Sequence, residues 1–220
     1  MNGYWIEFTQ VAVAHLLAVA SPGPDFAIIV KQSLSHGRST ARWTAVGVGT
    51  AILLHVGYSV LGLGLAIKSS PTVFAAVKYA GAAYIAWLGV QSLRAQPRQA
   101  EAARGTTQGE PEAGGGGANT PSPRAAFATG FFTNALNPKV TLFFVSLFAL
   151  VVSPATPRIV QVAYGVWMAV ATIGWFALVA TVFAHEGVRR KFLGYGHWID
   201  RGLGVVFLGF AVSLVVATVS

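Results

Sequence analysis

The chain has 220 residues, of which 54% are hydrophobic and only 10% are charged, whereas a soluble domain usually has about 25% charged residues. This composition excludes an ordinary water-soluble globule. The net charge of +8 would suit a nucleic-acid-binding protein if the basic residues were dense and clustered, but the low charge density argues against a nucleic-acid partner. Because the chain has no cysteine, disulfides and cysteine-ligated metal sites are excluded, and we expect no metal and no cofactor.

Hydropathy predicts an all-α, polytopic membrane protein with six transmembrane helices, since crossing a bilayer takes about 20 apolar residues. The predicted segments lie near residues 5–33, 41–66, 71–93, 125–152, 159–184 and 201–219. The first segment contains Ala18-Val19-Ala20, which resembles a signal-peptide cleavage site. No lysine or arginine precedes it, however, and Pro22 follows closely. We therefore expect this segment to be retained as a helix.

Residues 95–123 form the only long polar stretch and are rich in glycine and proline. Such a composition cannot bury a core, so it predicts a flexible linker. The linker divides the chain into residues 1–94 and 124–220, each with three predicted helices. A regulatory or partner-binding loop is the alternative interpretation, but a tether between two halves is favoured because the stretch has no recognition motif.

The basic residues indicate how the segments are oriented. Eleven of the 15 fall in the first, third and fifth connections: Lys31, Arg38, Arg42, Arg94, Arg98, Arg104, Arg124, Arg189, Arg190, Lys191 and Arg201. The other connections contain only Lys68 and Arg158. The positive-inside rule therefore predicts that the odd-numbered loops are cytoplasmic and that both termini are on the opposite, periplasmic side.

Proline motifs interrupt two of the predicted segments, with the sequence SPGPD at residues 21–25 and NALNPK at residues 134–139. Proline removes a helical hydrogen bond, and in hydrocarbon the freed carbonyl needs another partner. Each motif predicts a helix that stops and restarts, with Ser21 or Asn137 as N-cap and Pro22 or Pro138 at the first helical position. The amino end of a restarted helix can bind an anionic group inside the membrane.

The two motifs occupy equivalent places, in the first helix of each half. Because each half has an odd number of helices, the halves have opposite orientations and form two inverted three-helix repeats, an arrangement in which secondary transporters place substrate near the bilayer midplane. The alternative is that each proline only kinks a lipid-facing helix. We predict a substrate site that consists of the motif residues Ser21, Pro22, Gly23, Pro24, Asp25, Asn137, Pro138 and Lys139.

Asp25, Lys78, Lys139 and His55 fall within predicted segments, where a charge costs at least about 2.5 kcal/mol unless it is paired or hydrated. We expect Asp25 and Lys139 to meet, and to separate when a zwitterion binds its ammonium to Asp25 and its carboxylate to Lys139. A purely structural ion pair is the alternative. Histidine titrates near neutral pH, so His55 could join Asp25 in proton coupling, or it could only bond a neighbouring carbonyl.

Small residues recur at close spacing in several segments, for example Gly47, Gly49 and Gly57 in the second. Small residues let helices approach closely in a membrane. They indicate packing within one chain, with a homodimer as the alternative.

Five stretches carry a resemblance to a known family. They are LAVASPGPDF (residues 17–26), QSLSHGR (32–38), VKYAGAAYIAWLG (77–89), TGFFTNALNPK (129–139) and WIDRGLGVVFLGFAV (198–212). Together they resemble the lysine exporter (LysE) family, in particular its homoserine, threonine and leucine exporters. The resemblance implies a bacterial inner-membrane exporter of amino acids or related small zwitterionic metabolites, driven by proton antiport and compatible with a homodimer. It supports sites at residues 22–25 and 137–139, whereas the linker departs from the family.

Other classes of function are less well supported by the sequence. A channel could also use broken helices, but no ring of charges is recognisable. An embedded enzyme would need a catalytic motif, and neither H-E-x-x-H nor G-x-S-x-G occurs. A primary pump is excluded for this chain alone because it has no phosphate-binding loop. We therefore expect a transporter and not an enzyme.

Overall fold

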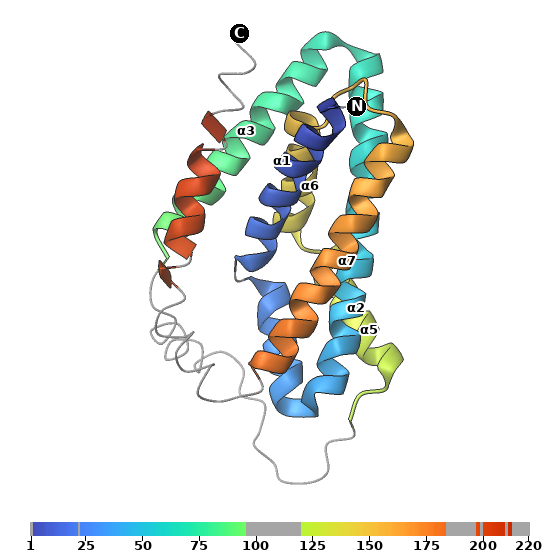
Figure 1. The fold of residues 1–220 in the computed structure, drawn as a ribbon, viewed down its shortest axis with the longest axis vertical. Coiled ribbons are helices and arrows are strands. Elements are labelled where there is room, and N and C mark those ends of the chain that lie inside the picture. The colour runs from blue at the N-terminus through green and yellow to red at the C-terminus, as the bar shows by residue number, and fades with distance from the viewer. Residues whose placement is uncertain are drawn as a thin grey trace.

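The computed structural model describes residues 2–21, 23–95, 120–183, 197–198, 200–209 and 211–212. Its helices are α1 (Asn2–Ala20), α2 (Pro24–Ser69), α3 (Pro71–Leu93), α5 (Pro123–Ala135), α6 (Pro138–Val151) and α7 (Arg158–Val182). Residues 200–209 are also helical, and no strand occurs in these ranges. Figure 1 shows an elongated bundle in which the helices run roughly along the long axis. The all-α prediction is confirmed for this part of the chain.

Helix α2 is the longest element and it turns within its length. Gly37 has φ 85° and ψ 169°, a conformation with positive φ that glycine adopts at little cost. In Figure 1 the α2 ribbon runs to one end of the bundle and there turns back alongside its own first part. The turn falls between residues 33 and 41, where the sequence analysis separates the first two segments.

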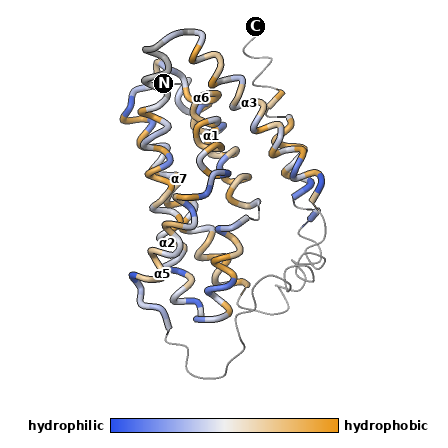
Figure 2. Tube along the Cα trace, turned by 180° about the vertical axis from the view of Figure 1, so that it is seen from behind, coloured by the Kyte–Doolittle hydropathy of each residue, from blue (hydrophilic) through white to orange (hydrophobic). Residues whose placement is uncertain are grey.

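Several helices are suited to a membrane. Pro24–Gly62 and Arg158–Val182 are each long and apolar enough to cross one, and α5 with α6 passes the same test as a pair bent by 59°. Figure 2 shows apolar residues along the length of these helices. The described residues therefore contain two or three candidate spans, and six spans in two inverted repeats stay a prediction. Most of the linker, Pro22 and the side chain of Lys78 lie outside the described residues.

Helices from the two predicted halves pack against one another. The most extensive contacts join α2 to α5 and α7, and smaller ones join α3 to α6 and α1 to both α6 and α7. A core cluster that includes Ile85, Phe144 and Met168 joins α3, α6 and α7, and a second includes Ile29 and Ala180 from α2 and α7. Both cores thus depend on contacts across the two halves.

The amino end of α1 is fixed by the buried side chain of Glu7. Its Oε2 accepts hydrogen bonds of 2.9 Å from the Ser153 backbone N–H and from the Thr156 hydroxyl, both in the α6–α7 connection. Nearby, the Tyr164 hydroxyl donates to the Tyr4 carbonyl at 2.9 Å. These bonds hold α1 against α7, which places the later part of α1 next to the break described below.

Two glycines allow α2 and α5 to touch backbone to backbone. A Cβ at Gly130 would lie 2.0 Å from the Thr44 carbonyl oxygen, and one at Gly47 would lie 2.1 Å from the Phe127 carbonyl oxygen. Neither neighbour is a side chain that could rotate away. Gly47, one of the small residues predicted to bring helices together, therefore does so within one chain at this crossing.

We expect Gly130→Ala to destabilise the protein by about 1–3 kcal/mol, the usual cost of overpacking, because α5 must move away from α2. The melting temperature of the purified protein in detergent measures this effect. Gly57→Ala is the matched control, since a Cβ at Gly57 meets nothing within 4 Å. Equal melting temperatures for the two variants would show that the α2–α5 crossing is not tightly packed.

Candidate functional site

The first break lies between α1 and α2. The Ser21 N–H continues α1 by donating to the Leu17 carbonyl at 3.1 Å, and the Ala27 N–H donates to the Gly23 carbonyl at 2.9 Å. Helix α2 therefore begins at Pro24, with Asp25 in its first turn. The prediction that Ser21 caps a restart at Pro22 is wrong, because the Ser21 N–H closes the last turn of α1 and the second proline of the motif takes the first helical position of α2.

The second break lies between α5 and α6. Asn137 is the N-cap of α6, its Oδ1 accepts from the Lys139 backbone N–H at 3.0 Å, and Pro138 starts the helix. The predicted restart is confirmed here. An asparagine cap satisfies one of the free N–H groups of the first turn, and the remaining amino end carries the positive pole of the helix dipole.

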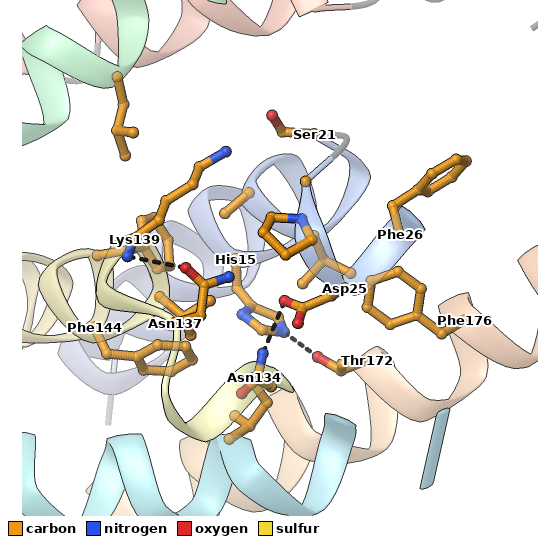
Figure 3. A pocket seen from close by; sticks show the side chains of 18 of the residues that line it. His15, Ser21, Asp25, Phe26, Asn134, Asn137, Lys139, Phe144, Thr172 and Phe176 are labelled. Atoms are coloured by element: carbon orange, nitrogen blue, oxygen red, sulfur yellow. Dashed lines mark hydrogen bonds between the residues drawn. The ribbon is translucent and has the colours of Figure 1, made fainter. Parts of the chain in front are cut away.

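Both breaks border one cavity (Figure 3). The volume that the centre of a water-sized sphere can occupy in it is about 60 Å³. One water needs roughly 10–15 Å³ on this scale, so the space admits a small polar ligand or several waters. Its apolar wall includes Phe143, Phe144, Phe176 and Phe207. The polar residues that line it are His15, Ser21, Asp25, Ser92, Asn134, Asn137, Lys139 and Thr172.

Most of the predicted site residues line this cavity. Ser21, Gly23, Pro24, Asp25, Asn137 and Lys139 do so. Pro138 is not among the lining residues, although it lies between two that are, and Pro22 lies outside the described residues. The sequence thus identifies two segments that are 109 or more residues apart and that the fold brings together.

Asp25 and Lys139 line the cavity without forming an ion pair with each other. Asp25 Oδ2 accepts a hydrogen bond of 2.9 Å from Asn134 Nδ2, while Asp25 Oδ1 has no hydrogen-bond partner in the described residues. Figure 3 shows the Lys139 side chain extending away from Asp25. The predicted direct contact is therefore replaced by a carboxylate–amide bond, because Asn134 at the end of α5 is the group that reaches Asp25.

Lys139 has a second acidic neighbour. Its ammonium interacts electrostatically with Asp200 and, more weakly, with Asp25. Asp200 is buried, in the helical residues near the carboxyl end. Asp200 is not among the predicted site residues, although a carboxylate at the start of an apolar segment is a signal that could have identified it.

His55 lies next to the second break and is not a lining residue of the cavity. It is fully buried, with Nε2 3.2 Å from the Asn134 carbonyl oxygen and Nδ1 hydrogen-bonded to the Tyr58 hydroxyl. Its ring stacks on Phe144 at 5.7 Å between centroids. The hydrogen bond to a carbonyl agrees with one of the two predicted roles, and through it His55 holds Asn134, which in turn binds Asp25.

His15 is a cavity residue that the sequence analysis missed. It is 1% exposed, and its Nε2 lies 2.9 Å from the Thr172 hydroxyl oxygen and 3.1 Å from the Met168 carbonyl oxygen. Residues 8–24 contain no Asp, Glu, Lys or Arg, and a prediction of membrane segments from the absence of these residues takes no account of histidine. A histidine in the middle of a predicted membrane helix was the available signal.

The cavity thus combines a carboxylate that has one unpartnered acceptor atom, an ammonium, the amino end of a helix and an aromatic wall. Opposite charges that do not neutralise each other can bind the two charges of a zwitterion. No cluster of three or more His, Asp or Glu side chains suited to a metal occurs among the residues that the structure describes.

Comparison with known proteins places these features in a family. The sequence pattern of the family described as LysE type translocator matches residues 16–218. A threonine efflux protein of Salmonella typhi is 29% identical over 210 residues, which cover 96% of this chain and 98% of the relative. A leucine efflux protein of Klebsiella pneumoniae is 27% identical over 218 residues, 95% of this chain and 94% of that protein. An uncharacterised membrane protein of Pseudomonas aeruginosa is 30% identical over 225 residues, 97% of each chain. No solved structure matches.

Proposed function

The chain belongs to the LysE type translocator family, and we propose that it exports zwitterionic amino acids across the bacterial inner membrane in exchange for protons. The family and the efflux proteins that it resembles make it a transporter and not an enzyme. Threonine and leucine are the first substrates to test, since relatives that match most of the chain are named for their efflux.

The observation that carries this proposal is that two opposite charges, Asp25 and Lys139, line one cavity without pairing to each other. We propose that Asp25 binds the ammonium of the substrate through its unpartnered Oδ1. Lys139 and the amino end of α6 bind the carboxylate, because both present positive charge to the cavity. The aromatic wall packs against the substrate side chain.

Exchange with protons follows from competition at Asp25. A carboxylate can either bind a proton or pair with an ammonium group, but once it is protonated it has no charge left to neutralise the ammonium. Loading the substrate therefore releases the proton, and reloading the proton releases the substrate. His55 is the second proposed coupling group, since it contacts the Asn134 carbonyl and Asn134 bonds Asp25. In this proposal the chain crosses the membrane six times, both termini are periplasmic, and the linker joins the two three-helix halves as a tether.

Transport by purified protein in proteoliposomes tests this function. We expect saturable exchange of labelled L-threonine or L-leucine that accelerates when a proton gradient is imposed in the direction opposite to substrate flow. Cells that express the protein should also accumulate less of a toxic amino-acid analogue. Flux that does not saturate would favour a channel, and saturable flux that is indifferent to the proton gradient would exclude the coupling.

A further inference from the structure

The His15 side chain lines the cavity and has one ring nitrogen without a hydrogen-bond partner among the described residues. Nδ1 is buried and has no hydrogen-bond partner in the described part of the chain, although the other ring nitrogen, Nε2, contacts Thr172 and Met168 on α7. An unsatisfied buried polar atom destabilises the site, so the site gains affinity for any ligand that supplies the missing bond.

The contacts of Nε2 decide what kind of bond Nδ1 can make. The Met168 carbonyl can only accept a hydrogen bond, whereas the Thr172 hydroxyl can accept or donate one. We therefore assign the proton to Nε2, because this tautomer satisfies the carbonyl. In a neutral imidazole the other nitrogen is then an acceptor. His15 therefore offers a hydrogen-bond acceptor, and not a donor, to a ligand in the cavity.

Asp25 offers a second acceptor in the same cavity. A carboxylate has no donor, so the amide atom of Asn134 that contacts Asp25 Oδ2 is the NH₂ group, and this bond leaves Asp25 Oδ1 without a partner. The His15 and Asp25 side chains both line this cavity (Figure 3). One of these acceptors is charged and the other is neutral.

We propose that His15 Nδ1 and Asp25 Oδ1 bind the same substrate ammonium group, so that the site selects for N–H donors as well as for positive charge. This inference rests on the proposed function, in which Asp25 receives the ammonium. A primary ammonium has three N–H groups, so it can bond both acceptors at once. His15 thereby adds a directed bond without adding a second negative charge that would need compensation in the membrane.

A series of N-methylated substrates tests this inference on the unaltered protein. L-Threonine and its N-methyl, N,N-dimethyl and N,N,N-trimethyl derivatives keep one positive charge but offer three, two, one and no N–H donors. We expect the inhibition constant, measured against exchange of labelled L-threonine, to be about tenfold or more higher for the dimethyl derivative than for the monomethyl derivative. The dimethyl derivative has only one N–H group and therefore loses a hydrogen bond to a charged group. L-Leucine and its derivatives are run in parallel, and α-methylthreonine controls for added bulk. Equal affinity across the series would overturn the proposal.

The substitution His15→Leu tests the residue itself. We expect it to weaken binding of the primary ammonium about tenfold or more and to reduce the penalty for the dimethyl derivative to within about threefold, because only one acceptor remains. His36→Leu is the matched control, since His36 bonds Gln32 within α2 and is not a lining residue. If His15→Leu does not fold, the methylated series on the unaltered protein decides alone.

Two further outcomes distinguish this proposal from a role of His15 in binding the substrate side chain and from a failure of the proposed function. If His15→Leu removes the preference for L-threonine over L-2-aminobutyrate but leaves the methylated series unchanged, His15 binds the side-chain hydroxyl and the proposal is overturned. If no amino acid is transported, the proposed function fails, and isobutylamine with its N-methyl derivatives then tests the ammonium site by stabilisation against heat. A stabilisation that decreases with each added N-methyl group would support the ammonium site, whereas equal stabilisation by all the amines would overturn it.

Discussion

Asp25→Asn is expected to reduce amino-acid exchange by at least about 30-fold, because removing one partner of a desolvated charged contact costs about 2–5 kcal/mol. The side chain keeps its size, and an amide can still bond the Asn134 side chain. The variant should therefore fold but bind the substrate ammonium poorly. Because the proton and the substrate are proposed to share this carboxylate, the proton gradient should also lose its effect on the remaining exchange. Initial rates in proteoliposomes, with and without a gradient, measure both results.

Glu7→Gln is the matched control for Asp25→Asn. It makes the same chemical change at a buried carboxylate of α1, but Glu7 bonds Ser153 and Thr156, and none of these three residues lines the cavity. We expect this variant to lose stability and to keep its coupling to protons. If Asp25→Asn instead exchanges substrate at the normal rate and with normal coupling, the proposed role of Asp25 is excluded.

The features of the site that depend on local chemistry are predictable from the sequence. The restart at Asn137 and Pro138 follows from the preferences of a helix amino end, and the structure confirms it. The first break was predicted less well, because residues 21–25 contain two prolines and either can start a helix. In the structure the Ser21 N–H closes the last turn of α1, and α2 begins at Pro24.

The contacts between side chains could not be predicted in the same way. That Asn134, and not Lys139, bonds Asp25 depends on how α5 ends relative to the start of α2, and tertiary packing sets that relation. His15 joins the site only because α1 packs against α7, which supplies Thr172 and Met168. Sequence patterns identify which residues are costly inside a membrane, but they do not specify the partners that compensate them.

Lys139→Met tests the other end of the proposed substrate. We expect the apparent affinity for amino acids to fall by at least about 30-fold, by the same cost of an unpaired charge, whereas amino-acid amides, which lack the carboxylate, should be affected little. The unaltered protein should therefore discriminate between L-threonine and L-threoninamide, and the variant should not. Competition against labelled substrate measures this ratio. Lys31→Met, at an exposed position of α2, is the matched control and should keep the discrimination.

The double variant Asp25→Asn with Lys139→Met distinguishes substrate binding from a structural role of the two charges. If Asp25 and Lys139 served only to compensate each other, removing both would relieve the unpaired charge that each single variant creates, and exchange would recover. In the structure Asp25 bonds Asn134, and Lys139 interacts electrostatically with Asp200 as well as with Asp25. Removing both charges should therefore recover little exchange. We therefore expect the double variant to fold, to remain in the membrane and to transport no better than either single variant. Recovery of exchange to near the normal rate would instead assign the two residues to holding the helices together.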